Sequence, residues 1–195
     1  MPRVRSLPIV LVALGMLAAC TPTPAVTASP TPVLQCTPEA GGPPAPCSKA
    51  DHDAMVAKDA LYAEAEAVYR KYFDERVRLW KSGGTLTSTP VLDEVTTGPF
   101  KDDNLRQFKQ QAESGWEVRG EVSLAVLRRN PGVSKGASVV SLVSCTDQTK
   151  GTAYKGPTPM TPGTMTRDVL YFVKLDGALK VWGADGSGVT TCVGA

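Results

Sequence analysis

Five cysteines and one histidine carry the most reactive side chains of this 195-residue sequence. Cysteine thiolates can bind zinc, act as nucleophiles or pair as disulfides, and their spacing favours one of these uses. No two cysteines form a C-x-x-C pair and His52 is the only histidine, so the sequence does not offer the usual ligands of a zinc site. Thiol catalysis needs a histidine base, and His52 stands near the expected start of a helix. We therefore expect no metal site, no cofactor and no catalytic cysteine.

The N-terminus has the parts of a secretory signal. Met1 to Arg5 is basic, and Leu7 to Leu17 is an apolar run of 11 residues that ends in small residues. A membrane-spanning helix needs about 20 apolar residues, so this run is too short to be one. Residues 1–19 are therefore predicted to be a signal peptide that is removed from the mature chain.

The segment Leu17-Ala18-Ala19-Cys20 resembles the lipobox of bacterial lipoproteins. The resemblance implies cleavage before Cys20 and a diacylglyceryl thioether on its sulfur, with palmitate-type acyl chains that anchor the chain to the outer face of the cell membrane. One acyl chain binds a membrane only marginally, and a lipobox protein carries at least two. The alternative is ordinary signal cleavage that leaves Cys20 unmodified.

Charge argues against a nucleic-acid partner. The signal peptide holds two arginines and no acidic residue, so the mature chain has 19 basic and 19 acidic side chains. Its formal net charge is zero, and the excess of positive charge typical of nucleic-acid-binding proteins is absent from the sequence.

A proline-rich segment follows the lipobox. Residues 21–47 include eight prolines in 27 positions, together with many Thr, Ala and Gly. Such a segment buries too little apolar surface to fold alone, and proline favours extended polyproline II. We expect residues 20–47 to be a disordered linker between the lipid and a domain at 48–195. A proline-rich docking motif or a glycosylated tract is the alternative.

The four cysteines beyond Cys20 form an even set in an exported protein, where disulfides are expected. Four cysteines allow three connectivities. We favour Cys36–Cys47, which closes a small loop, and Cys145–Cys192, which joins two strand-like segments. Loop-closure entropy assigns these bonds on the order of 3 and 4 kcal/mol as upper values.

Helices are predicted in the first half of the domain. Residues 51–81 contain no Gly or Pro, and apolar residues recur in them at helical spacing. Ser48 to Asp51 fits a capping box, and Gly83-Gly84 ends the helix. Two shorter helices are expected, from Thr89-Pro90 to about Val95 and from Thr97-Gly98-Pro99 to about Ser114.

Aromatic residues gather on one side of the long predicted helix and at the start of the sheet. They can line a ligand cavity or fill the core, and an aromatic stripe at helical spacing is more often core. The candidates for a cavity lining are Tyr62, Tyr69, Phe73 and Trp116.

Strands are predicted from residue 116 onward. Trp116 to Arg129 alternates apolar and polar residues, and Gly120 marks a bend or bulge within it. Asp176-Gly177 is a strong hairpin signal. The other expected segments are a strand at 136–147, a loop at 156–163, strands at 165–175 and 178–182, a turn at 185–188 and a last strand at 189–193.

Helices followed by antiparallel strands indicate an α+β fold, with a curved sheet over the long helix. The pattern of the 51–81 helix, two shorter helices, the strand bent at Gly120 and the hairpin at 176–177 resembles the NTF2-like (SnoaL-like) superfamily of cone-shaped domains. Together with the lipobox, the linker and a Cys145–Cys192 pair, it resembles secreted lipoproteins of actinobacteria.

The superfamily resemblance implies no particular activity here. Its enzymes use Tyr/Asp, His/Asp or Asp-Arg-Asp groups, and none of these matches this sequence residue by residue. Asp102 and Asp103 are adjacent in a helix and point about 100° apart, so they do not converge. Inward strand positions are mostly apolar, and we expect no inward Asp or Tyr within hydrogen-bond reach of a second polar group. We predict no catalytic residues.

Two function classes follow from the resemblance. The first is a module at the outer face of the cell membrane that binds a small apolar ligand or an envelope protein. The second is a structural envelope lipoprotein with a filled core, serving phage exclusion if it is phage-borne. A cavity with convergent polar groups favours the first class, and a large apolar surface patch favours the second. We expect a monomer or a weak homodimer.

Overall fold

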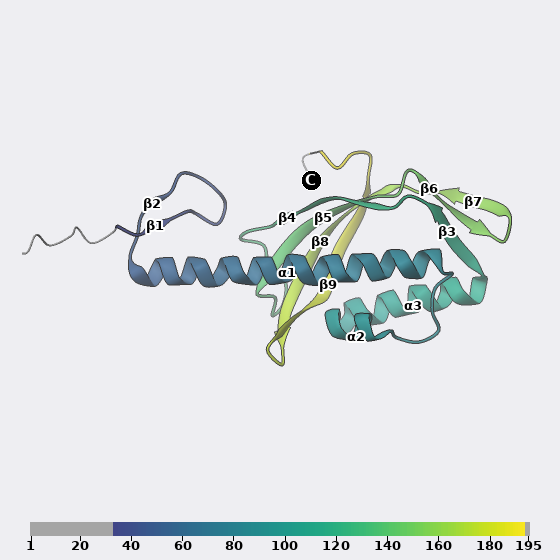
Figure 1. Ribbon diagram of the computed structural model, residues 1–195, viewed down its shortest axis with the longest axis horizontal. Coiled ribbons are helices and arrows are strands. Elements are labelled where there is room, and N and C mark those ends of the chain that lie inside the picture. The colour runs from purple at the N-terminus through teal and green to yellow at the C-terminus, as the bar shows by residue number, and fades with distance from the viewer. Residues whose placement is uncertain (1–32, 194–195) are drawn as a thin grey trace, which may run out of the picture. The chain divides into compact units, whose positions relative to one another are not determined.

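The structure, a computed structural model, describes residues 33–193 (Figure 1). The predicted signal peptide, the lipobox Cys20 and linker residues 20–32 lie outside the described residues. Over the described range the fold is α+β, as predicted, with three helices and antiparallel sheets. None of the helices described there is long and apolar enough to cross a membrane.

The domain begins earlier than residue 48, the boundary expected from the sequence. Strand β1 (Gln35–Cys36) pairs with β2 (Ala45–Pro46), and the Cys36–Cys47 disulfide closes this hairpin. The hairpin is tied to the first helix, because the Thr37 amide donates to Met55 Sδ over 3.3 Å and the Tyr62 hydroxyl donates to Glu39 over 2.5 Å. Residues 33–47 therefore belong to the folded domain, whereas composition alone had favoured a disordered linker.

The helices follow the capping signals. Helix α1 (Lys49–Lys81) begins after Ser48, whose hydroxyl accepts from the Asp51 amide. Helix α2 (Pro90–Val95) is capped in the same way by Thr89. Helix α3 (Gly98–Ser114) ends at Gly115, whose φ of 70° is the left-handed conformation that glycine adopts readily.

Two antiparallel sheets make up the rest of the domain. The order of the larger sheet is β4-β5-β8-β9, and that of the smaller is β3-β6-β7. Gly120, with φ of 98°, ends the first strand, so the predicted 116–129 strand is divided between the two sheets. The strands are β3 (Trp116–Gly120), β4 (Ser123–Arg129), β5 (Val140–Asp147), β6 (Gly151–Lys155), β7 (Thr158–Pro162), β8 (Met165–Leu175) and β9 (Ala178–Val189).

Three predictions for the C-terminal strands were wrong. The loop expected at 156–163 contains β7, the turn expected at 185–188 lies inside β9, and residues 190–193 form no strand. The glycines of β9 suggested a turn, yet Gly186 and Gly188 pair with β8 in regular register. A glycine-rich segment has little strand preference of its own, so the pairing partner decides its conformation.

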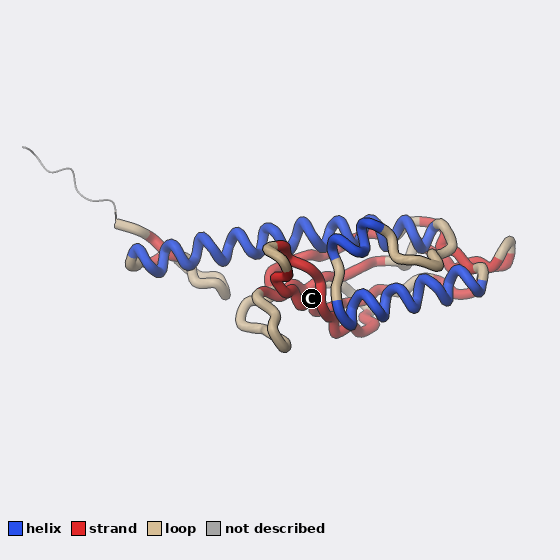
Figure 2. The backbone as a smooth tube through the Cα atoms, turned by 90° about the horizontal axis from the view of Figure 1, so that it is seen from below, coloured by secondary structure: helices blue, strands red, loops and turns tan. Residues whose placement is uncertain are grey.

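The helices lie on one side of the larger sheet, and Figure 2 views the domain from that side. The core forms where α1 packs on β5, β8 and β9, and the link between α2 and α3 is fixed to the sheet by the Thr97 amide, which donates to the Val181 carbonyl over 2.9 Å. Cys145, fully buried in β5, is bonded to Cys192. Both disulfides favoured from the sequence are therefore present.

Candidate functional site

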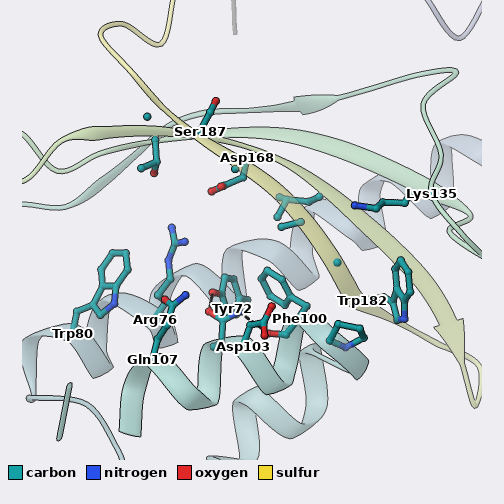
Figure 3. A pocket seen from close by; sticks show the side chains of 18 of the residues that line it. Tyr72, Arg76, Trp80, Phe100, Asp103, Gln107, Lys135, Asp168, Trp182 and Ser187 are labelled. Carbon is teal, nitrogen blue, oxygen red and sulfur yellow. Dashed lines mark hydrogen bonds between the residues drawn. The ribbon is translucent and has the colours of Figure 1, made fainter. Parts of the chain in front are cut away.

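A cavity of about 720 Å³ lies between the helices and the inner face of the larger sheet (Figure 3). Helix α1 contributes Tyr72, Arg76 and Trp80, which are spaced four residues apart and so share one face of the helix. Helix α3 supplies a second wall, and β8 and β9 supply the side opposite α1. The polar and aromatic residues of these other walls are Phe100, Asp103, Asn104, Gln107, Thr166, Asp168, Trp182 and Ser187.

Tyr72 and Asn104 join α1 to α3 at the cavity wall. The Tyr72 hydroxyl donates to Asn104 Oδ1, and the Asn104 amide donates to the Phe100 carbonyl over 2.7 Å. The Tyr72 ring meets the edge of the Phe100 ring at a centroid distance of 5.0 Å. Burial raises the pKa of Tyr72 well above its ordinary value, so the hydroxyl keeps its proton and remains a donor.

Arg76 brings a permanent positive charge into the cavity. Its guanidinium carbon lies 4.7 Å from the centroid of the Trp80 ring and 5.4 Å from those of Tyr72 and Phe73. Its Nη2 donates to Thr146 Oγ1 over 2.9 Å, whereas its Nε is buried and has no hydrogen-bond partner in the described structure. Three aromatic rings therefore hold the cation in place and leave donors unused.

Asp168 faces Arg76 from the opposite wall (Figure 3). The register of β5 and β8 pairs Ser144 with Asp168 and Thr146 with Thr166, so all four side chains project from the inner face. Burial raises the pKa of Asp168, and the charge of Arg76 offsets this rise in part. No ion pair joins the two groups, and within residues 33–193 no hydrogen bond to the carboxylate is found.

Glycines of β9 leave room beside the Asp168 carboxylate. A Cβ on Gly186 would overlap Asp168 Oδ1, and a Cβ on Gly188 would meet nothing within 4 Å. The backbone of β9 thus stays open on the cavity side, because its inward positions at 184, 186 and 188 carry at most a methyl group. The glycines that suggested a turn instead shape this wall.

Lys135 closes one end of the site. Its ammonium forms an ion pair of 2.6 Å with Asp185, which also accepts a 2.9 Å hydrogen bond from the Tyr171 hydroxyl. The hydrogen bond to Asp185 raises the pKa of Lys135, and the same contact lowers the pKa of Asp185. These charges neutralise one another, and Asp103 is paired with Arg106, so among the described lining residues the charges left unpaired are those of Arg76 and Asp168.

A smaller hollow of about 310 Å³ adjoins the cavity. The two spaces share Trp80, Gln107 and Gln148 as lining residues. Trp116 and the smaller sheet form the far side of the hollow.

None of the four candidate cavity residues lines the main cavity: Tyr62, Tyr69 and Phe73 lie in the core, the alternative favoured by helical spacing. Tyr62 bonds to Glu39, the Tyr69 hydroxyl is 2.8 Å from Ser144 Oγ in the core, and Phe73 packs in the core as well. Trp116 lines the smaller hollow. The face of α1 that lines the cavity carries Tyr72, Arg76 and Trp80 and lies beside the face that was expected to do so. Helical spacing alone does not determine which of two neighbouring faces points into a cavity.

The expectation of no inward Asp or Tyr near a second polar group was wrong. Tyr72 bonds to Asn104 inside the cavity, and Asp168 lines it. The available signal was alternation in β8, because Thr166 and Asp168 share a strand face with Leu170, which is buried. A similar signal was available for Arg76, which is a charged residue between the aromatic residues Tyr72 and Trp80 at helical spacing.

The other reactive residues gather in no common site. His52 is in the first turn of α1 and does not line the cavity, Asp102 is exposed, and Asp103 pairs with Arg106 at the cavity wall. Over residues 33–193 no cluster of His, Cys, Asp or Glu could hold a metal ion. The cavity is thus equipped for hydrogen bonding and charge recognition.

Comparisons with known proteins give few matches. No protein-family model and no curated protein match this chain. Among solved structures, the crystal structure of the intermembrane space region of the chloroplast protein ARC6 matches with a TM-score of 0.43 and 13% sequence identity, covering 65% of this chain and 95% of that one.

Proposed function

We propose that this protein is an extracytoplasmic lipoprotein whose α+β domain binds a small organic ligand in the cavity between α1, α3 and β8. The observation that carries the proposal is the pair of unpaired charges, Arg76 and Asp168, facing each other in a cavity with aromatic walls. Its volume of about 720 Å³ lies within the range of small-molecule sites, which combine apolar walls with a few convergent polar groups.

Location outside the cytoplasm is supported by two independent features. The disulfides Cys36–Cys47 and Cys145–Cys192 are typical of oxidising compartments. The N-terminal signal and the lipobox add a route of export and an anchor on Cys20 at the outer face of the cell membrane. A proline-rich linker would then hold the domain away from the lipid.

The element order supports an NTF2-like cone. Three helices precede the larger sheet, the long α1 packs across its inner face, and Gly120 separates the strand directions where the chain passes between sheets. In such an arrangement the open end of the cone is the natural entrance to the cavity.

We propose binding in preference to catalysis. A general acid or base works with a second polar group that positions it or shares its proton. Asp168 has no such hydrogen-bonded neighbour among the described residues, and Tyr72 is committed to Asn104. The space inside the domain also favours a ligand-binding role over that of a structural lipoprotein with a filled core.

The anchor is tested by Cys20→Ser. In a bacterial host fed radiolabelled palmitate, the wild-type protein is expected to take up label and to partition into detergent, and the variant to do neither. Cys36→Ser, which leaves the lipobox intact, is the control and should keep the label. Equal labelling of wild type and Cys20→Ser would refute acylation at this residue.

The ligand is tested by native mass spectrometry of protein extracted from its own membrane. A bound mass is expected in the wild type and is expected to be lost in Arg76→Met. Arg70→Met is a matched control, because Arg70 is exposed on the same helix and does not line the cavity. A bound mass that survives in Arg76→Met would place the ligand elsewhere.

A further inference from the structure

Building on the proposed ligand binding, we infer that the cavity recognises a compact head group that carries both a hydrogen-bond acceptor and an N–H donor. A primary amide and an ammonium carboxylate both have this chemistry. The body of the ligand is flat and apolar. The inference combines the unused capacity of Arg76, the unused capacity of Asp168, and the aromatic surfaces beside them.

Arg76 supplies donors only, because a guanidinium has no acceptor. Its Nη2 serves Thr146, its Nε is buried out of a ligand's reach, and no hydrogen bond from its Nη1 is found within residues 33–193. The rings of Trp80, Tyr72 and Phe73 lie 4.7–5.4 Å from the guanidinium carbon and restrict its position. The ligand must therefore present an acceptor to α1.

When it is ionised, the Asp168 carboxylate has acceptors and no donor. It stands on β8 across the cavity from Arg76, with the bare backbone of Gly186 beside it. Because no described side chain or backbone amide donates to it, the ligand must present a donor to β8.

The two charges select against simple ions. An anion that binds Arg76 is repelled by Asp168, and a cation that binds Asp168 is repelled by Arg76. A head group with an acceptor on one side and a donor on the other satisfies both at once. Such a head group also leaves the net charge of the cavity unchanged, which limits the free-energy cost of removing water from the cavity when the ligand binds.

Aromatic rings accommodate the body of such a ligand. Phe100 on α3 and Trp182 on β9 line the same cavity as Trp80 (Figure 3). Flat apolar groups stack on such rings with more attraction than their buried area alone provides. A phenyl-bearing molecule is therefore a suitable probe.

The test uses four probes of similar size: 3-phenylpropanamide, phenylalanine, 3-phenylpropionate and phenethylammonium. Binding to the full domain is read from the NMR signals of the Trp80 and Trp182 indole N–H groups, assigned with Trp→Phe variants. The amide or phenylalanine is expected to bind about tenfold more tightly than both singly charged probes. The stronger of the two identifies the head group as amide or ammonium carboxylate.

Charge variants give a second readout that a structural role would not move. Asp168→Asn should shift the preference toward phenylpropionate by about tenfold, and Arg76→Met should shift it toward phenethylammonium by a similar factor. Asp102→Asn and Arg70→Met are exposed controls and should keep the wild-type order.

The failures are distinguishable. If a singly charged probe binds as tightly as both dual probes, or Asp168→Asn leaves the order unchanged, the inference about the head group is wrong while ligand binding stands. Toluene is added as a probe without a polar head group. If neither toluene nor any of the four other probes moves the Trp80 and Trp182 signals, the proposed ligand binding fails as well. Because Asp168→Asn preserves shape, this test does not depend on Arg76→Met folding.

Discussion

The Asp168 carboxylate on β8 lies so close to the backbone of Gly186 on β9 that a Cβ on Gly186 would overlap Oδ1. The two residues are register partners in the sheet. The absence of a side chain at 186 thus allows the carboxylate to lie along the cavity wall opposite Arg76. This relationship links the glycine content of a strand to the chemistry of the site.

Gly186→Ala is expected to move the carboxylate while sparing the fold. The added methyl displaces a short side chain, and the backbone at 186 is not in the left-handed region, so we expect the free energy of unfolding to change by less than about 1 kcal/mol. Affinity for 3-phenylpropanamide or phenylalanine, whichever binds wild type more tightly, should fall about tenfold in calorimetric titration. Gly188→Ala, whose Cβ meets nothing within 4 Å, is the control for stability.

Asp168→Asn is expected to stabilise the domain at neutral pH. Because burial raises the pKa of Asp168, the folded protein holds a proton in a pH window where the unfolded chain, with an ordinary value of 3.8, has lost it. Ionisation therefore lowers stability as the pH rises through this window. We expect a gain of about 1 kcal/mol near neutrality, the usual scale for relieving such a site, and no gain below the ordinary pKa. Urea unfolding at several pH values measures it, and a less stable variant near neutrality contradicts it.

The buried contact between Tyr69 and Ser144 is expected to show strong coupling. Both residues are fully buried and their hydroxyl oxygens lie 2.8 Å apart. Tyr69→Phe or Ser144→Ala alone should cost about 1–3 kcal/mol, because the remaining hydroxyl loses its partner. The double variant should cost less than the sum of the two single variants. Additive effects in urea unfolding would show that each hydroxyl is satisfied independently.

The two disulfides are expected to differ in their effect on stability. Cys145–Cys192 closes 47 residues and joins the sheet to the C-terminal segment, so replacing both cysteines by serine should cost up to about 4 kcal/mol. Cys36–Cys47 closes 11 residues in a hairpin whose two strands join neither of the main sheets, so its loss should cost less than about 3 kcal/mol and loosen the hairpin locally. Hydrogen exchange separates local opening from global unfolding. Equal protection loss throughout the domain in both variants contradicts this difference.

Local chemistry in the sequence was sufficient for the helices and the disulfides. Ser48, Thr89 and Gly115 are capping residues whose effect depends on their neighbours in the chain, and the helix bounds followed from them. The hairpin at Asp176-Gly177 is equally local. The α+β class followed from the order of these segments. The observed cysteine pairs were favoured because one closes a small loop and the other joins two strand-like segments.

The cavity and its charges were decided by tertiary structure. Which face of α1 opens into the cavity depends on how the helix rolls against the sheet, and this roll moved the lining from Tyr69 and Phe73 to Tyr72 and Arg76. Gly186 became part of a strand because β8 supplies its hydrogen-bond partners, and a chain segment by itself carries no such information. Arg76 and Asp168, 92 positions apart in the sequence, meet only when the sheet closes over the helix.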